Sequence, residues 1–250
     1  MSVISKHVRA VFFDLDETLL DDDRSMREAV TRTCQALARH HKHIDSTKLE
    51  TTYLRVAEEW WLGSSSVPRT SESGSTAGRD IRIEVWGKAF NAYGLTDKDL
   101  AVEAADIYTS ERRAGYCLFP DASQALQALH PRYTLGVITN GPAETQREKL
   151  HVTGIVPYLH TFVISGELGV GKPDPGIFLK ALESAKVTPE EAVHVGDSLT
   201  SDVAGARGIG MYAVWINRTK TARPQNAPDP DLEIHSLHAL VSLLISDRLL

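Results

Sequence analysis

The chain has 250 residues, of which 42% are hydrophobic and 24% charged, as is typical of a folded protein with one large domain or two smaller ones. Its formal net charge of −6 argues against a nucleic-acid backbone as the main partner, although a local cationic site could still bind a small anion. No apolar run approaches the roughly 20 residues of a membrane-spanning helix, and Cys34 and Cys117 have no metal-ligand spacing. We therefore expect a cytoplasmic protein with neither a nucleic-acid nor a membrane partner.

The first predicted strand covers residues 10–13 and is followed at once by two carboxylates, Asp14 and Asp16. A short apolar run of this kind is typical of a buried strand. The strand delivers both acids to its carboxyl end, which is where open α/β sheets bind ligands. Taken alone, such a pair is more often a turn or a helix cap than a site that handles phosphate through a metal ion.

A helical pattern follows between residues 21 and 117, with no convincing strand inside it. Apolar side chains recur there at helical spacing, which predicts an inserted α-helical module. Within this module, the segment from Gly63 to Gly78 is rich in Ser, Thr and Gly; a linker and a lid over the site are equally good interpretations. The predicted helices lie near residues 26–37, 49–60, 83–93 and 100–112.

From residue 118 onward, strand-length apolar runs alternate with helical patterns. This alternation is typical of right-handed crossovers in a mostly parallel sheet with helices on both faces. We therefore predict a Rossmann-like α/β core formed by residues 1–20 and 118–250, with residues 21–117 as an inserted helical cap. Predicted strands cover residues 135–138, 160–164, 192–195 and 211–216, and predicted helices cover residues 122–129, 145–150, 175–185, 201–207 and 236–244.

Further polar clusters also stand close behind predicted strands. Each has an ordinary explanation as a turn, a solvated loop or a helix cap. Because the carboxyl ends of parallel strands meet at one edge of the sheet, their joint placement favours a catalytic site instead. His194 lies inside a predicted strand and is interpreted as a packed core residue. The clusters are Thr139-Asn140-Gly141, Gly171-Lys172-Pro173-Asp174, and Gly196-Asp197 with Asp202 five residues further on.

Together these motifs resemble those of the haloacid dehalogenase superfamily, specifically its phosphatase branch. The pattern there is DxDxT, then a Thr or Ser after the second strand, then a Lys, then GDxxxxD. The resemblance covers nearly the whole chain, with the helical insert matching only in kind, and Ser201 stands where family members often have Asn. The matching residues are Asp14, Asp16, Thr18, Thr139, Lys172, Gly196, Asp197 and Asp202.

The resemblance implies a role for each motif. Asp14 would be the nucleophile that forms an aspartyl-phosphate, and Asp16 would be the general acid and then the general base. Asp14, Asp197 and the backbone carbonyl of Asp16 would hold one Mg²⁺. Asp202 would orient the metal-bound waters or Lys172. The phosphoryl oxygens would be bound by Thr139, Lys172 and the amides of Asn140 and Gly141.

The same resemblance separates several reactions. Asp16 argues against dehalogenation, and residues 20–24 lack the His and Thr that related sugar-phosphate mutases use near the cap. We expect a phosphatase of a small phosphorylated metabolite, acting as a monomer or small homo-oligomer; a mutase and a non-catalytic binding protein remain the alternatives. Several segments look most like N-acylneuraminate 9-phosphate phosphatases and pyrimidine 5′-nucleotidases, namely residues 139–142, 145–150, 171–173 and 214–217, and residues 82–86 in the cap.

Overall fold

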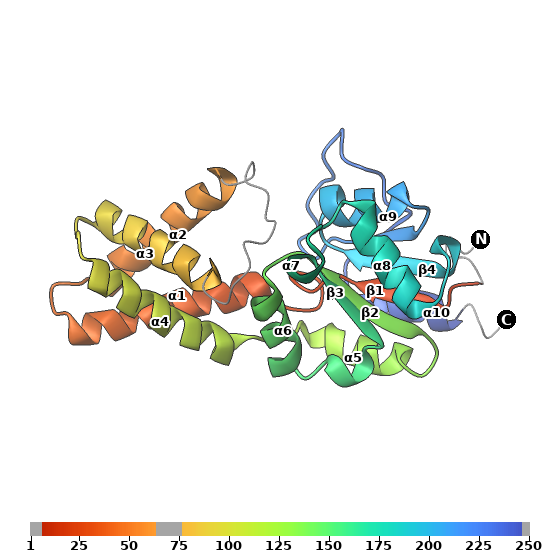
Figure 1. Cartoon of the computed structure of the whole chain (residues 1–250), viewed down its shortest axis with the longest axis horizontal. Helices are drawn as coiled ribbons and strands as arrows, with labels where there is room; N and C mark the ends of the chain where they lie inside the picture. The colour runs from red at the N-terminus through yellow and green to blue at the C-terminus, as the bar shows by residue number, and fades with distance from the viewer. Residues whose placement is uncertain (1–6, 64–76, 247–250) are drawn as a thin grey trace. The chain divides into compact units, whose positions relative to one another are not determined.

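The computed structural model describes residues 7–63 and 77–246, so the predicted lid segment, Gly63 to Gly78, lies almost wholly outside the described residues. The chain divides into two compact units (Figure 1). One unit, the sheet unit, comprises residues up to 21 and from 117 onward, and the other, the helical unit, comprises residues 22–116.

The sheet unit is built on six parallel strands in the order β3-β2-β1-β4-β5-β6. This arrangement confirms the α/β class with a mostly parallel sheet. The sequence patterns did not predict β6, which is a three-residue strand at the sheet edge. The strands are β1 (Ala10–Phe13), β2 (Thr134–Thr139), β3 (Thr161–Ile164), β4 (Ala192–Gly196), β5 (Tyr212–Ile216) and β6 (Leu232–Ile234).

Helices cover both faces of this sheet because the strand order reverses beside β1. The chain steps from β1 to β2 and β3 in one direction, and from β3 across to β4 and β5 in the other. Right-handed crossovers then place α5 and α6 on one face and α8 and α9 on the opposite face. The helices are α5 (Pro120–Leu129), α6 (Ala143–Val152), α7 (Ser165–Leu168), α8 (Pro175–Ala185), α9 (Ala204–Gly208) and α10 (Leu237–Ser246), and a π-helical turn, η4 (Leu199–Val203), precedes α9.

The core of the sheet unit holds β1 rigidly in the middle of the sheet. Phe12 on β1 is fully buried and packs in one cluster with Ile177 and Phe178 of α8. Full burial of a side chain of this size contributes about 1.5–3 kcal/mol. Helix α8 begins as its sequence predicts, with Asp174 accepting the Gly176 N–H at 2.7 Å and a proline in the first turn.

The helical unit is a bundle of four helices with a core of its own. Trp86 lies at the centre of that core, fully buried, with its ring centroid 4.0 Å from that of Tyr53. Every helix that the apolar spacing predicts is present, which confirms that helical periodicity located this unit. The helices are α1 (Asp22–His40), α2 (Ser46–Gly63), α3 (Ala77–Tyr93) and α4 (Lys98–Gly115).

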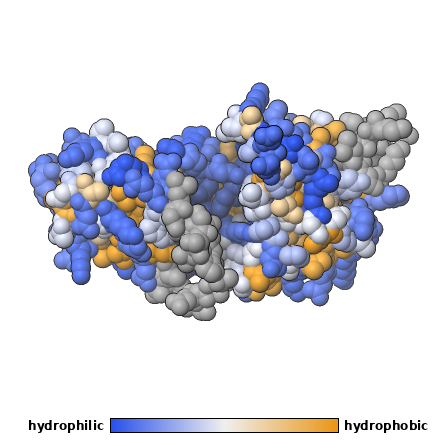
Figure 2. All heavy atoms as spheres, turned by 90° about the horizontal axis from the view of Figure 1, so that it is seen from above, coloured by the Kyte–Doolittle hydropathy of each residue, from blue (hydrophilic) through white to orange (hydrophobic). Residues whose placement is uncertain are grey.

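The described surface carries no unusual apolar area. Figure 2 shows hydrophilic residues over most of the visible face, with small apolar patches scattered among them. Large hydrophobic side chains that are well exposed, such as Leu179 and Val152, are few among the described residues. None of the helices within residues 7–63 and 77–246 is long and apolar enough to cross a membrane.

Candidate active site

Strand β1 places Asp14 at the point where three strand ends meet. Its neighbour Phe13 is paired with Val137 of β2 on one side and Val195 of β4 on the other. The Asp14 N–H donates to the Val195 carbonyl at 2.8 Å, which extends the ladder by one residue and fixes the backbone of Asp14. The side chain emerges at the carboxyl edge of the sheet with only 11% of its surface exposed.

Lys172 joins Asp14 to Asp202. Its Nζ lies 2.6 Å from Oδ1 of Asp14 and 2.6 Å from Oδ1 of Asp202, and its side chain is almost fully buried. Burial alone would lower the pKa of Lys172, but the two carboxylates raise it above its ordinary value. The side chain therefore stays an ammonium ion and offers a fixed positive charge beside Asp14.

Both oxygens of Asp202 accept hydrogen bonds from groups of the protein. Its Oδ1 also accepts from Nε2 of His194 at 2.9 Å, and its Oδ2 accepts from the Ser198 N–H at 3.0 Å. Burial would raise the pKa of Asp202, but Lys172 and His194 hold it well below its usual range. Asp202 is therefore the counter-ion that keeps Lys172 in place, and His194, predicted as a core residue, is buried and hydrogen-bonded to it.

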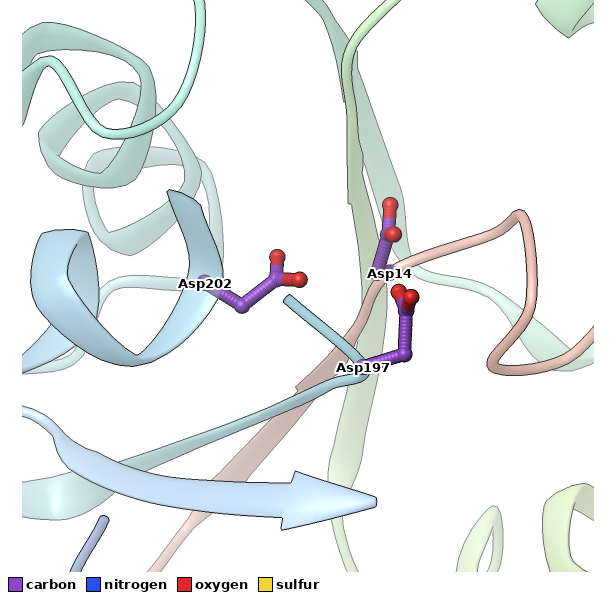
Figure 3. Close-up of side chains that lie close together, drawn as sticks. All are labelled: Asp14, Asp197 and Asp202. Carbon is purple, nitrogen blue, oxygen red and sulfur yellow. The ribbon is translucent and has the colours of Figure 1, made fainter. Parts of the chain in front are cut away.

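Asp14, Asp197 and Asp202 form an acidic cluster, in which one carboxylate oxygen from each lies within 4.8 Å of the others. Figure 3 shows the carboxylates of Asp14 and Asp197 side by side, with that of Asp202 directed toward them. Burial, reinforced by Asp202, raises the pKa of Asp197 to about 6. Burial also raises the pKa of Asp14, against the opposing effect of Lys172. A cluster of buried oxygen donors of this kind could hold a hard divalent cation.

Helix α6 contacts the second acid of the first motif. Nζ of Lys149 lies 2.8 Å from Oδ1 of Asp16, and Nε2 of Gln146 donates to its Oδ2 at 3.1 Å. Gln146 also donates to Oγ1 of Thr139 at 2.6 Å. The sequence motifs did not identify Gln146 or Lys149 as site residues; the available signal was their spacing of three on a helix that follows the second motif.

Two residues of the loop after β2, Asn140 and Gly141, are hydrogen-bonded to other parts of the sheet unit. The Asn140 side chain donates to the Lys172 carbonyl at 2.9 Å and accepts from the Lys172 N–H at 2.8 Å. The Gly141 N–H donates to Oγ of Ser165 at 2.9 Å. Asn140 thus fixes the backbone that carries Lys172, while phosphate binding by the amides of Asn140 and Gly141 stays a prediction.

Asp22 and Asp23, which follow the first motif, pair with arginines of the helical unit. Asp22 pairs with Arg112 at 2.7 Å, and Asp23 pairs with Arg27 at 2.8 Å. Arg112 is buried and also donates to Oγ of Ser25 at 2.8 Å. The Arg112 contacts tie the first turn of α1 to the last turn of α4, whereas the Asp23–Arg27 pair lies within α1.

The chain is similar to known proteins over most of its length. A family model described as haloacid dehalogenase-like hydrolase matches residues 8–210. An N-acylneuraminate-9-phosphatase of Mus musculus is 30% identical over 96% of this chain and 94% of its own length. A pyrimidine 5′-nucleotidase of Escherichia coli is 33% identical over 65% of this chain and 69% of its own length.

The fold has solved counterparts as well. The magnesium-bound structure of YfnB, a putative hydrolase of the same superfamily from Bacillus subtilis, superposes with a TM-score of 0.76 and 21% identity, covering 96% of this chain and all of that one. These matches confirm the resemblance that the four sequence motifs indicated, including both groups of relatives. The chain therefore belongs to the haloacid dehalogenase-like hydrolases, and within them to the enzymes that hydrolyse phosphate monoesters.

Proposed function

We propose that the protein is a Mg²⁺-dependent phosphatase of a small phosphorylated metabolite, which works through an aspartyl-phosphate on Asp14. The observation that carries this proposal is the pairing of buried Asp14 with Lys172, itself anchored by Asp202, at the end of the central strand. A carboxylate is a weak nucleophile, so fixed position and charge neutralisation must provide most of the acceleration. Lys172 supplies both, because it holds one oxygen of Asp14 and brings a permanent positive charge to the incoming phosphate.

The reaction has two half-reactions. In the first, a carboxylate oxygen of Asp14 attacks phosphorus, the bond from phosphorus to the ester oxygen breaks, and Asp16 delivers a proton to the departing oxygen. In the second, Asp16 takes a proton from a water molecule as the water oxygen attacks phosphorus. The bond to Asp14 then breaks, which releases phosphate and restores both carboxyl groups. Thr139 and Lys172 bind the phosphoryl oxygens throughout.

A metal ion fits the same donor set. Asp14, Asp197 and the backbone carbonyl of Asp16 would hold Mg²⁺, whose charge reduces the repulsion between a phosphate dianion and neighbouring carboxylates. Asp202 stays outside this ligand set in the proposal, because both of its oxygens already accept hydrogen bonds from Lys172, His194 and Ser198.

The partner is a small anion rather than a macromolecule. A net charge of −6 disfavours a nucleic-acid backbone, whereas Lys172 and the Mg²⁺ that the site would hold would together offset the carboxylates and attract a phosphate. The related enzymes act, by their names, on a phosphorylated sugar acid and on nucleotides. We accordingly propose a cytoplasmic enzyme that is a monomer or small homo-oligomer.

The test is phosphate release from a panel of phosphorylated sugars, nucleotides and small acids, with Mg²⁺ and with chelator, for the wild type and Asp14→Asn. We expect metal-dependent turnover of at least one compound, which the substitution abolishes while the thermal unfolding midpoint in the presence of chelator stays close to that of the wild type. A folded wild-type protein that releases no phosphate from any compound, and whose unfolding midpoint does not respond to Mg²⁺, would contradict the proposal.

A further inference from the structure

Two buried side chains on one face of α6 hold both oxygens of Asp16. Lys149 contacts Oδ1 at 2.8 Å, and Gln146 contacts Oδ2 at 3.1 Å. Residues three apart on a helix project from the same face, so a single rigid element supplies both contacts. A carboxylate gripped at both oxygens cannot rotate about its terminal bond without breaking one of them.

These two residues, named here the α6 pair, are more buried than the group they hold. Lys149 is 4% exposed and Gln146 is 1% exposed, whereas the side chain of Asp16 is 31% exposed. An ammonium group is costly to bury unless it is paired, and Asp16 provides that partner. The buried α6 pair therefore fixes the Asp16 carboxylate from the protein interior, and the exposed part of Asp16 stays accessible to a ligand.

Gln146 also connects Asp16 to the phosphate-binding end of β2. The same Nε2 donates to Oγ1 of Thr139 at 2.6 Å and lies 3.3 Å from the Asn140 carbonyl. An amide nitrogen has two protons, so these contacts share them. The position of Asp16 is thereby tied to the group that would bind the phosphoryl oxygens.

We propose that Gln146 and Lys149 are positioning residues, which align Asp16 with the leaving-group oxygen of a phosphate monoester held by Thr139. The inference rests on the proposed phosphatase function. Each Asp16 oxygen keeps a second lone pair beyond its contact with α6, so one oxygen can still carry the proton that moves to the departing oxygen. Accurate alignment matters because proton transfer needs heavy-atom distances of about 2.6–3.2 Å.

A positioning role predicts a dependence on the leaving group that a structural role does not. An alkoxide must be protonated as it departs, whereas the 4-nitrophenolate ion leaves readily without a proton. The parameter kcat/KM covers the steps up to the first phosphoryl transfer, so it reports departure of the leaving group and not hydrolysis of the shared aspartyl-phosphate. Loss of alignment should therefore lower kcat/KM for alkyl phosphates selectively.

The experiment compares Lys149→Met with the wild type on 4-nitrophenyl phosphate and on the best alkyl phosphate from the panel. We expect kcat/KM for the alkyl phosphate to fall about 100-fold, the lower end of what general acid catalysis contributes, while that for 4-nitrophenyl phosphate changes little. Lys180→Met is the matched control, because Lys180 makes an exposed pair with Glu183 on α8. If Lys149→Met does not fold, Lys149→Gln, which keeps an N–H donor, should show a smaller change in the same direction.

A double-mutant cycle with Asp16→Asn tests whether the substitution of Lys149 acts through Asp16. With phenyl phosphate, whose leaving group is of intermediate basicity, Lys149→Met should lower kcat/KM in the wild-type background and have little further effect beside Asp16→Asn. Equal losses for all leaving groups, or losses that add in the double variant, would overturn the inference and leave the phosphatase function standing. A wild-type protein inactive on every ester would instead overturn the phosphatase function, and this inference with it.

Discussion

Gly196 and Asp202 approach each other so closely that no side chain fits between them: a Cβ on residue 196 would lie 2.2 Å from Cγ of Asp202. Gly196 is the last residue of β4, and Asp202 lies in the π-helical turn that follows. Because residue 196 has no side chain, Asp202 can lie against the end of β4, where its carboxylate contacts Lys172. The glycine of this motif is thus required by space rather than by backbone conformation.

The first prediction concerns this contact. Gly196→Ala must displace Asp202, which loosens Lys172 and misplaces the charge beside Asp14, so we expect kcat/KM to fall by about 100-fold or more. Gly208→Ala is the matched control, since nothing lies within 4 Å of a Cβ there. Steady-state kinetics on the best substrate measures the difference. Equal activity of the two alanine variants would show that the placement of Asp202 is not needed.

Thr139 provides a second prediction. It is the last residue of β2 and is fully enclosed, with its Oγ1 bonded to Gln146. Thr139→Val keeps the shape but removes the hydroxyl, so we expect a loss of about 100- to 1,000-fold in kcat, as for other donors to a transferring group. Kinetics with and without added inorganic phosphate as a competitive inhibitor also tests ground-state binding. A variant with wild-type kcat would exclude the hydroxyl from phosphoryl stabilisation.

Stabilisation by Mg²⁺ should depend on pH. Burial, reinforced by Asp202, raises the pKa of Asp197 to about 6 in the folded protein, whereas the pKa of an aspartate in an unfolded chain is about 4. Ionisation of Asp197 therefore destabilises the metal-free protein. Its free energy of unfolding should fall as the pH rises between these two pKa values. Because the ion binds the deprotonated carboxylates, it reverses that cost.

Thermal unfolding with Mg²⁺ and with chelator measures this effect. The increase in the unfolding midpoint on adding Mg²⁺ should be larger at about pH 8 than at about pH 5, where protons compete with the ion. Asp197→Asn should remove most of the increase at the higher pH. An increase that is the same at both pH values would place the ion at some other site.

A stability prediction concerns Arg218, which lies in the sheet unit. Its guanidinium contacts Asp121 through two nitrogens, at 3.0 and 3.1 Å, donates to the Thr18 carbonyl at 2.7 Å and lies 3.7 Å from the ring centre of Phe119. A lysine ammonium cannot make the same two-nitrogen contact with Asp121. Arg218→Lys should therefore lower the free energy of unfolding by about 2 kcal/mol.

The control for Arg218→Lys is Arg9→Lys, which alters an exposed pair with Glu191. Exposed pairs contribute about 1 kcal/mol or less, so this variant should unfold close to the wild type. Denaturant titration of both variants compares them directly. If Arg9→Lys were the more damaging change, the contacts of Arg218 would not be the ones that stabilise the loop after β1.

Sequence patterns predict the elements best where the periodicity is strong. Residues 10–13 form an apolar run that ends at Asp14, and residues 192–195 form a run, apolar except for His194, that is followed by Gly196 and Asp197; β1 and β4 lie there. Strand β6 is not predicted, because three residues at the sheet edge, with Glu233 in the middle, are too short a run to show an apolar pattern. The turn Leu199–Val203 is π-helical and begins two residues before the helix predicted at 201–207. The Ser201 N–H donates to the Ser198 hydroxyl, which caps the turn at Ser198.

The residues of the candidate site also differ in how far the sequence predicts them. Motif order is sufficient to select Asp14, Lys172 and Asp202, which the structure joins by direct contacts. The roles of Gln146 and Lys149 depend on which face of α6 lies against the end of β1, and that is a property of tertiary packing. Helical spacing alone places them together without indicating what they contact.

The most direct test of the central claim is to look for the covalent intermediate. The enzyme is mixed with Mg²⁺ and its best substrate, quenched in acid within the first turnovers, digested and analysed by peptide mass spectrometry. We predict that the peptide containing Asp14 carries the mass of one phosphoryl group, that fragmentation assigns the group to Asp14, and that Asp14→Asn shows none. Rapid turnover with no phosphoryl group on that peptide, and with Asp14→Asn as active as the wild type, would contradict the mechanism.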